Sequence, residues 1–198
     1  MEFKKLSKKV VSLAVAAAVV ASSIVAPGAA KKAEAAKSYS AYLCFASKGY
    51  NGALTNHNDS NRSKGVMNGN GEKAIGGIKV SNASFKKGKV SFTVSATGKN
   101  LKKFAKDKGW NSMYVDTSLP EKDKSKLKIT KAVIKMDGKV VKTIKNPALT
   151  PDPGKTQDFT QIMCLNTWNK NSEAKCKAAS VTKMPKKSIS ITITGKLK

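Results

Sequence analysis

Regular alternation of apolar and polar residues over short segments is the feature that most constrains the fold. In residues 89–97, valine and phenylalanine alternate with serine and threonine, and in residues 188–194 three isoleucines alternate with the same polar types. A period of two residues is typical of a strand with one buried and one solvated face. Both segments therefore predict half-buried antiparallel strands.

A hairpin is predicted around Asp137-Gly138, which separates the apolar-patterned segments 127–136 and 139–144. An Asp-Gly pair suits a type I′ turn, because both central residues of that turn need a positive φ. The two flanking segments should therefore pair directly with each other.

Further strands are predicted at residues 38–46, 112–116 and 159–166, with a short helical turn at 99–108 whose Leu101, Phe104 and Ala105 point inward. The Gly-, Asn- and Ser-rich segment 49–71 is expected to be a long loop that can hold a short strand. Three prolines in 146–154 predict an extended loop there. This series of short strands with turn signals between them predicts an all-β fold, a two-sheet antiparallel β-sandwich of jelly-roll-like type.

The first 35 residues are typical of a secretory signal peptide. Four lysines precede an uncharged apolar run, residues 10–25, and Ala33-Glu34-Ala35 gives a cleavage site before Ala36, with a second candidate site before Lys31. The apolar run is shorter than the roughly 20 residues of a membrane-spanning helix, so a retained anchor is the weaker alternative. The lysine-rich start resembles that of exported Gram-positive proteins. We therefore expect a signal peptide at 1–35, a single domain at 36–198 and a secreted product with no membrane span after cleavage.

Net charge bounds the partners of the domain. Removing residues 1–35 takes six of the 38 basic and two of the 12 acidic residues, which leaves a net charge of about +22. Such a charge favours anionic partners, including anionic cell-wall polymers. Arg62 is the only arginine, and lysine is poorly suited to bidentate recognition of phosphates or guanine edges, so nucleic acid is not favoured.

Three cysteines follow the signal segment. Cys164 and Cys176 are a candidate disulfide that would close a short loop, whereas Cys44 lies in an apolar strand pattern and is expected to be a buried thiol. The wide cysteine spacing and the single histidine, His57, match no zinc motif. No metal or cofactor is predicted.

Catalysis is not expected. Most of the remaining acidic residues fall in predicted turns, and no nucleophile has an identifiable partner. Asp116, at the end of a predicted strand, is the one acidic residue expected near a groove. The sequence therefore predicts a domain that is not an enzyme and has no catalytic residue.

The aromatic residues indicate a binding function. Trp110 and Trp168 both lie at strand ends beside asparagine and outside the alternating pattern. Sugar rings have an apolar face and a polar rim, so a flat aromatic with Asn or Asp partners suits them. Partial burial at the sandwich edge is the alternative role for each tryptophan. The predicted carbohydrate-binding residues are Trp168, Trp110, Asn166, Asn169 and Asp116, with Tyr42, Tyr50 and Tyr114 as weaker candidates.

Four segments, 39–46, 134–141, 165–169 and 189–195, together resemble jelly-roll carbohydrate-binding modules of secreted clostridial polysaccharide-degrading proteins. The resemblance spans nearly the whole predicted domain and implies a β-sandwich that binds polysaccharide without catalysis.

The sequence is compatible with two functions. In the first, the domain binds polysaccharide by aromatic stacking and Asn/Asp hydrogen bonds. In the second, it is a lysine-rich envelope protein, adhesive or structural, that anionic wall polymers hold at the cell wall, and its binding would weaken as salt rises.

Overall fold

The computed structural model describes residues 37–49, 53–54, 67–68, 73–151, 159–167 and 181–198. Residues 35–198 form one compact unit. The predicted signal peptide lies outside the described residues. In the described part of the chain, neither short helix has the length and apolar character needed to cross a membrane.

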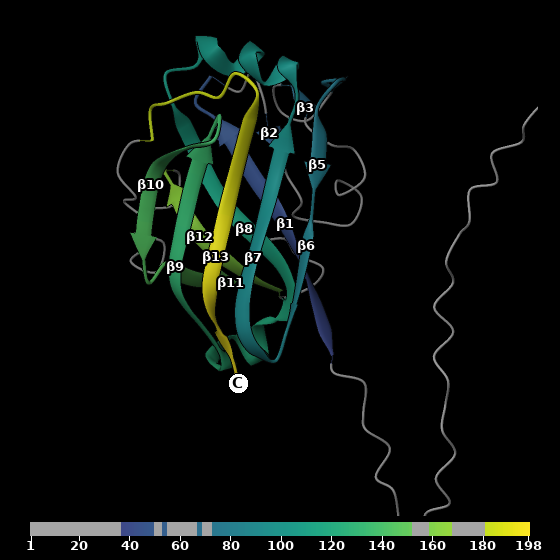
Figure 1. Ribbon diagram of the computed structural model, residues 1–198, viewed down its shortest axis with the longest axis vertical. Helices are drawn as coiled ribbons and strands as arrows, with labels where there is room; N and C mark the ends of the chain where they lie inside the picture. Colours follow the sequence, from purple (N-terminus) through teal and green to yellow (C-terminus); the bar gives the residue numbers. More distant parts are fainter. Residues whose placement is uncertain (1–36, 50–52, 55–66, 69–72, 152–158, 168–180) are drawn as a thin grey trace, which may run out of the picture. The chain divides into compact units, whose positions relative to one another are not determined.

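The larger sheet has eight strands, and all of its pairings are antiparallel (Figure 1). Its strands follow the order β11 (Ala148–Pro151), β12 (Phe159–Asn166), β8 (Trp110–Pro120), β1 (Ser38–Ser47), β2 (Ala53–Leu54), β3 (Met67–Asn68) and β4 (Lys73–Ala74), with β6 (Ala83–Lys86) also paired to β1. The long strands β8 and β1 form its centre.

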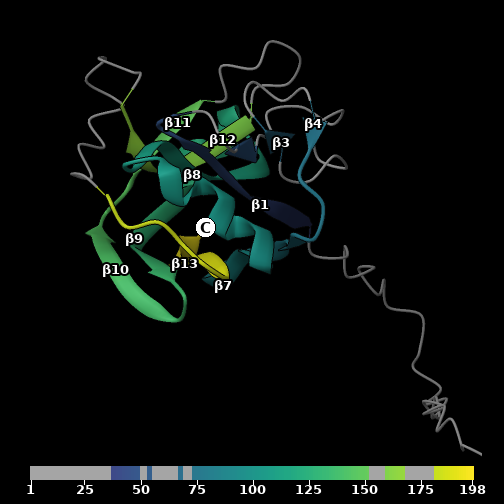
Figure 2. The same cartoon turned by 90° about the horizontal axis from the view of Figure 1, so that it is seen from above.

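The smaller sheet has five antiparallel strands in the order β10 (Lys139–Lys145), β9 (Leu127–Met136), β13 (Ser188–Leu197), β7 (Gly88–Thr97) and β5 (Lys79–Ser81). Two 3₁₀ helices, η1 (Lys99–Lys106) and η2 (Glu121–Lys126), connect the two sheets. Figure 2 shows the sheets as two facing layers. The predicted two-sheet antiparallel sandwich is confirmed.

The core lies between the layers, where the inward faces of both sheets meet. Val90, Val94, Ile191 and Ile134 from the smaller sheet share one buried cluster with residues of the larger sheet such as Leu43. Each fully buried aliphatic side chain contributes on the order of 2 kcal/mol through the hydrophobic effect. The alternation seen in the sequence thus corresponds to one face in this core and one face outside it.

The Asp137-Gly138 hairpin joins β9 and β10 as predicted, with φ of 50° at Asp137 and 78° at Gly138. The Asp137 carboxylate also accepts hydrogen bonds from the backbone N–H groups of Lys186, Lys187 and Ser188, at 2.9, 2.7 and 3.0 Å. Partial desolvation acts to raise the pKa of Asp137, but these three donors outweigh it and the pKa is lowered. The turn therefore also fixes the start of β13.

Several local expectations were wrong. The proline-containing segment from Asn146 includes β11, because an edge strand tolerates a proline at its end. Ala105 of η1 is exposed, although Leu101 and Phe104 are buried as predicted. Strands β5 and β6 were not predicted, because each has at most four residues. The short strands β2 and β3, by contrast, agree with the prediction that the long loop can hold a short strand.

Candidate functional site

A row of four polar side chains crosses the outer face of the larger sheet. Tyr42 on β1 is the cross-strand partner of Asp116 on β8, Asp116 is the partner of Gln161 on β12, and Gln161 is the partner of Thr150 on β11. Directly opposed residues on one face of an antiparallel sheet have Cβ atoms about 5 Å apart. We call these four residues the outer polar row.

Three members of the outer polar row are buried: Asp116 is 0% exposed, Gln161 2% and Thr150 7%. Tyr42, at one end, is half-buried. In the described part of the chain, neither Gln161 Nε2 nor Thr150 Oγ1 has a hydrogen-bond partner. Native proteins contain few such atoms, and each one raises the question of a functional role.

A second row, mainly apolar, lies beside the first on the same face. It consists of Cys44, Tyr114, Met163 and Ala148, which are successive partners across β1, β8, β12 and β11. These residues form a small apolar cluster separate from the main core. The outer face therefore places an aromatic side chain, Tyr114, two residues from Asp116 along the same strand and face.

Asn166 extends this face at the end of β12, where it is half-buried and opposite Ser112 of β8. The next residue, Thr167, makes two hydrogen bonds to Asn111. Its backbone N–H donates to the backbone carbonyl of Asn111 at 2.7 Å, and its Oγ1 donates to Asn111 Oδ1 at 3.1 Å. These contacts hold the end of β12 against the start of β8. Of the predicted binding residues, Tyr42, Asp116 and Asn166 thus share one sheet face.

Trp110 belongs to the core, so its predicted role in stacking on a ligand does not fit the structure. It is the first residue of β8, is 1% exposed, and packs edge-on against Phe45 and Phe104 at centroid distances of 5.3 and 6.4 Å. Its Nε1–H donates to the carbonyl of Lys183 at 3.0 Å. A tryptophan with both ring faces packed and its polar atom satisfied offers no surface to a sugar.

Trp168, Asn169 and Tyr50 lie outside the described residues, and their predicted roles stay predictions. The same holds for the proposed Cys164–Cys176 disulfide, because Cys176 is outside them too. Cys164 is fully buried in the main core, next to an irregularity in the pairing of β12 with β8. Cys44 is buried as expected, but on the outer face of β1.

Gln161 and Thr150 were not among the predicted binding residues. Gln161 lies in a predicted strand and alternates with the apolar Ile162. This alternation could have indicated that the Gln161 side chain lies on the outer face of the sheet. Thr150 was hidden because its segment was predicted to be a loop.

Comparison of the chain with protein-family models, with curated proteins and with solved structures finds no match. Among the described residues, no group of three His, Cys, Asp or Glu side chains could hold a metal ion.

Proposed function

We propose that this protein is a non-catalytic domain that binds polysaccharide through the outer face of its larger sheet. The observation that carries the proposal is the outer polar row, which brings Tyr42 and Asp116, both predicted binding residues, into register with Gln161 and Thr150.

The energetics of the outer polar row support a functional role. A buried amide or hydroxyl without a hydrogen-bond partner costs about 1 to 3 kcal/mol, whereas an apolar side chain of similar size would stabilise the same position. Sequences violate such local rules mainly at functional sites. The row is thus better explained by a ligand than by stability of the fold.

The chemistry of the face suits a sugar. A sugar hydroxyl both donates and accepts hydrogen bonds, so it can pair with the hydroxyl of Tyr42 and with the side-chain amide of Asn166. Tyr42 and Asn166 are half-buried, so they are the accessible predicted binding residues of this face, and we assign the direct contacts to them. Asp116 and Gln161 are buried and follow Tyr42 across the sheet in the outer polar row.

Retention of the protein on insoluble cellulose, on xylan and on purified cell wall, at high salt, tests the proposal. The variant Tyr42→Ala should lose retention on the neutral glycan. Tyr39→Ala is the matched control, because Tyr39 lies on the same strand but packs toward the core, with its ring centroid 5.7 Å from that of Phe85. Equal retention of Tyr42→Ala and the unaltered protein would refute the assignment of this face.

A further inference from the structure

Like charges face each other across the outer side of the smaller sheet. Lys196 on β13 is the direct partner of Lys89 on β7 and of Lys128 on β9, and Lys131 on β9 is the partner of Lys145 on β10. All five side chains are exposed. Like charges directly opposite each other destabilise a sheet, so three such pairs on one face are a cost to the fold.

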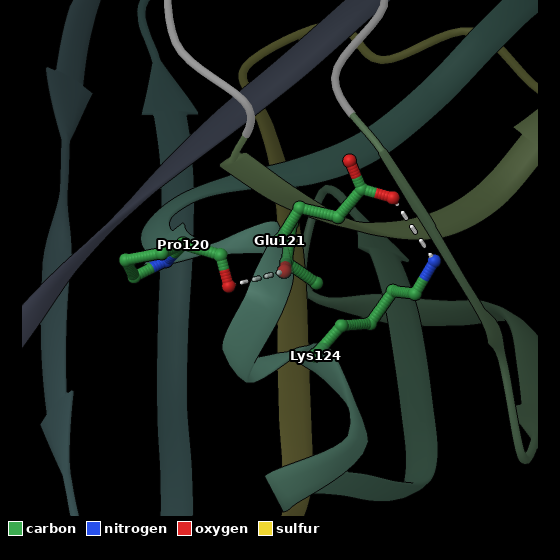
Figure 3. A network of polar contacts seen from close by, with 4 residues as sticks. Pro120, Glu121 and Lys124 are labelled. Carbon is green, nitrogen blue, oxygen red and sulfur yellow. Dashed lines mark hydrogen bonds and ion pairs between the residues drawn. The ribbon is translucent and has the colours of Figure 1, made fainter.

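No acidic residue offsets these charges from within the smaller sheet, since none of its five strands contains Asp or Glu. Two acidic residues near the start of β9 instead pair within η2: Glu121 with Lys124 at 3.4 Å (Figure 3) and Asp123 with Lys126 at 2.6 Å. We call the outward side of the five strands the lysine face. Its lysines are Lys79, Lys89, Lys128, Lys131, Lys135, Lys145 and Lys196.

Hydroxyl groups occupy the centre of the lysine face. The outward positions of the adjacent strands β7 and β13 pair serine and threonine with each other. The Oγ1 atoms of one such pair, Thr93 and Thr192, are 2.8 Å apart and share a hydrogen bond. The only aromatic residue of the five strands, Phe92, is buried in the core, and the strands contain no arginine. A surface without exposed rings has nothing on which unpaired bases could stack, and without arginine it lacks the forked donors that read guanine edges.

We propose that the lysine face is a second binding surface, independent of the outer polar row, for an anionic polymer rich in hydroxyl groups. The lysines neutralise its repeating negative charges, and the serine and threonine hydroxyls exchange hydrogen bonds with its own. Counterion release drives the association, so it weakens steeply as salt rises. Polyuronates and polyol phosphates share this chemistry.

Affinity electrophoresis of the full protein in native gels tests the proposal. The gels contain polygalacturonate, poly(ribitol phosphate), neutral dextran or duplex DNA, each at several salt concentrations. The variant Lys89→Gln/Lys128→Gln/Lys196→Gln removes the row of three lysines. The matched control, Lys102→Gln/Lys103→Gln/Lys106→Gln, removes three exposed lysines of η1 and lowers the net charge by the same amount.

The face variant should bind the anionic glycan probe at least ten-fold more weakly at low salt, and its salt dependence should drop by about one unit of slope per lysine removed. The η1 control should retain most of the affinity. Retardation by polygalacturonate alone or by poly(ribitol phosphate) alone would support the proposal and identify the charged group. No retardation by either probe, equal losses in both variants, or tighter binding to duplex DNA would overturn it.

Folding of the face variant is checked by denaturant unfolding, in which removal of the opposed charges should leave the protein as stable or more stable. The face variant should keep its binding to neutral glycan. Failure of the proposed polysaccharide-binding function would therefore appear in the neutral-glycan retention assay, whereas failure of the lysine face would appear in the gels with anionic polymers.

Discussion

Asp116 of β8 and Gln161 of β12 are direct cross-strand partners, and both side chains are buried on the outer face of the larger sheet. In the described residues, Gln161 Nε2 has no hydrogen-bond partner, so an apolar side chain would be more favourable than this amide at the same buried position. We therefore attribute the outer polar row to the proposed ligand binding rather than to stability of the fold.

Isosteric substitution of two threonines should show this directly. Thr117 Oγ1 donates to the carbonyl of Thr160 at 2.6 Å and accepts from the backbone N–H of Leu119 at 3.2 Å, so Thr117→Val should lower the free energy of unfolding by about 1 to 3 kcal/mol. Thr150→Val removes an Oγ1 that has no hydrogen-bond partner in the described residues and should raise it by up to about 1 kcal/mol. Urea unfolding measures both. Destabilisation of similar size in both variants would show that Thr150 is a structural residue.

Trp110→Phe should separate the core from the binding face. Loss of the Nε1–H bond to Lys183 and of part of the indole should lower the free energy of unfolding by about 2 kcal/mol. Retention on a neutral glycan should not change, because Trp110 is a core residue. A variant of unaltered stability that no longer binds would contradict this placement.

Asp137 should make stability dependent on pH at the acid end. Its folded-state pKa is below the ordinary value of 3.8, so its stabilisation is present above about pH 4 and is lost as pH falls through the folded-state pKa. Asp137→Asn tolerates the positive φ and should cost about 1 kcal/mol near neutral pH, since the carboxylate is largely solvated. The difference from the unaltered protein should shrink as the pH falls below 4.

The control for this experiment is Asp123→Asn, which removes an exposed pair with Lys126 within η2 and should have a smaller effect near neutral pH. A difference between Asp137→Asn and the unaltered protein that stayed constant from pH 7 to acid would contradict the role given to the charge.

Much of the fold could be predicted because its strongest signals are local. The alternation in residues 89–97 and 188–194 and the Asp137-Gly138 turn depend only on neighbouring residues, and the strands formed there with nearly the expected bounds. Trp110 was misplaced because its burial depends on Phe45 and Phe104, which approach it only in the folded chain.

The outer polar row was predicted only in part for a similar reason. Tyr42 and Asp116 could be proposed as binding residues from their residue types alone. Their alignment with Gln161 and Thr150 could not be predicted, because it depends on the register between strands far apart in sequence. The opposed lysines of the lysine face were equally hidden, since net charge says nothing about which lysines become neighbours.

Backbone amide chemical-shift mapping with cellohexaose and xylohexaose, at high salt, tests whether the outer face of the larger sheet binds polysaccharide. We expect one of these neutral oligosaccharides to shift amides of β1, β8 and β12 around Tyr42, Asp116 and Gln161, and we expect Tyr42→Ala, but not Tyr39→Ala, to abolish the shifts. Shifts confined to β7, β9 and β13, or none with either oligosaccharide, would contradict this expectation.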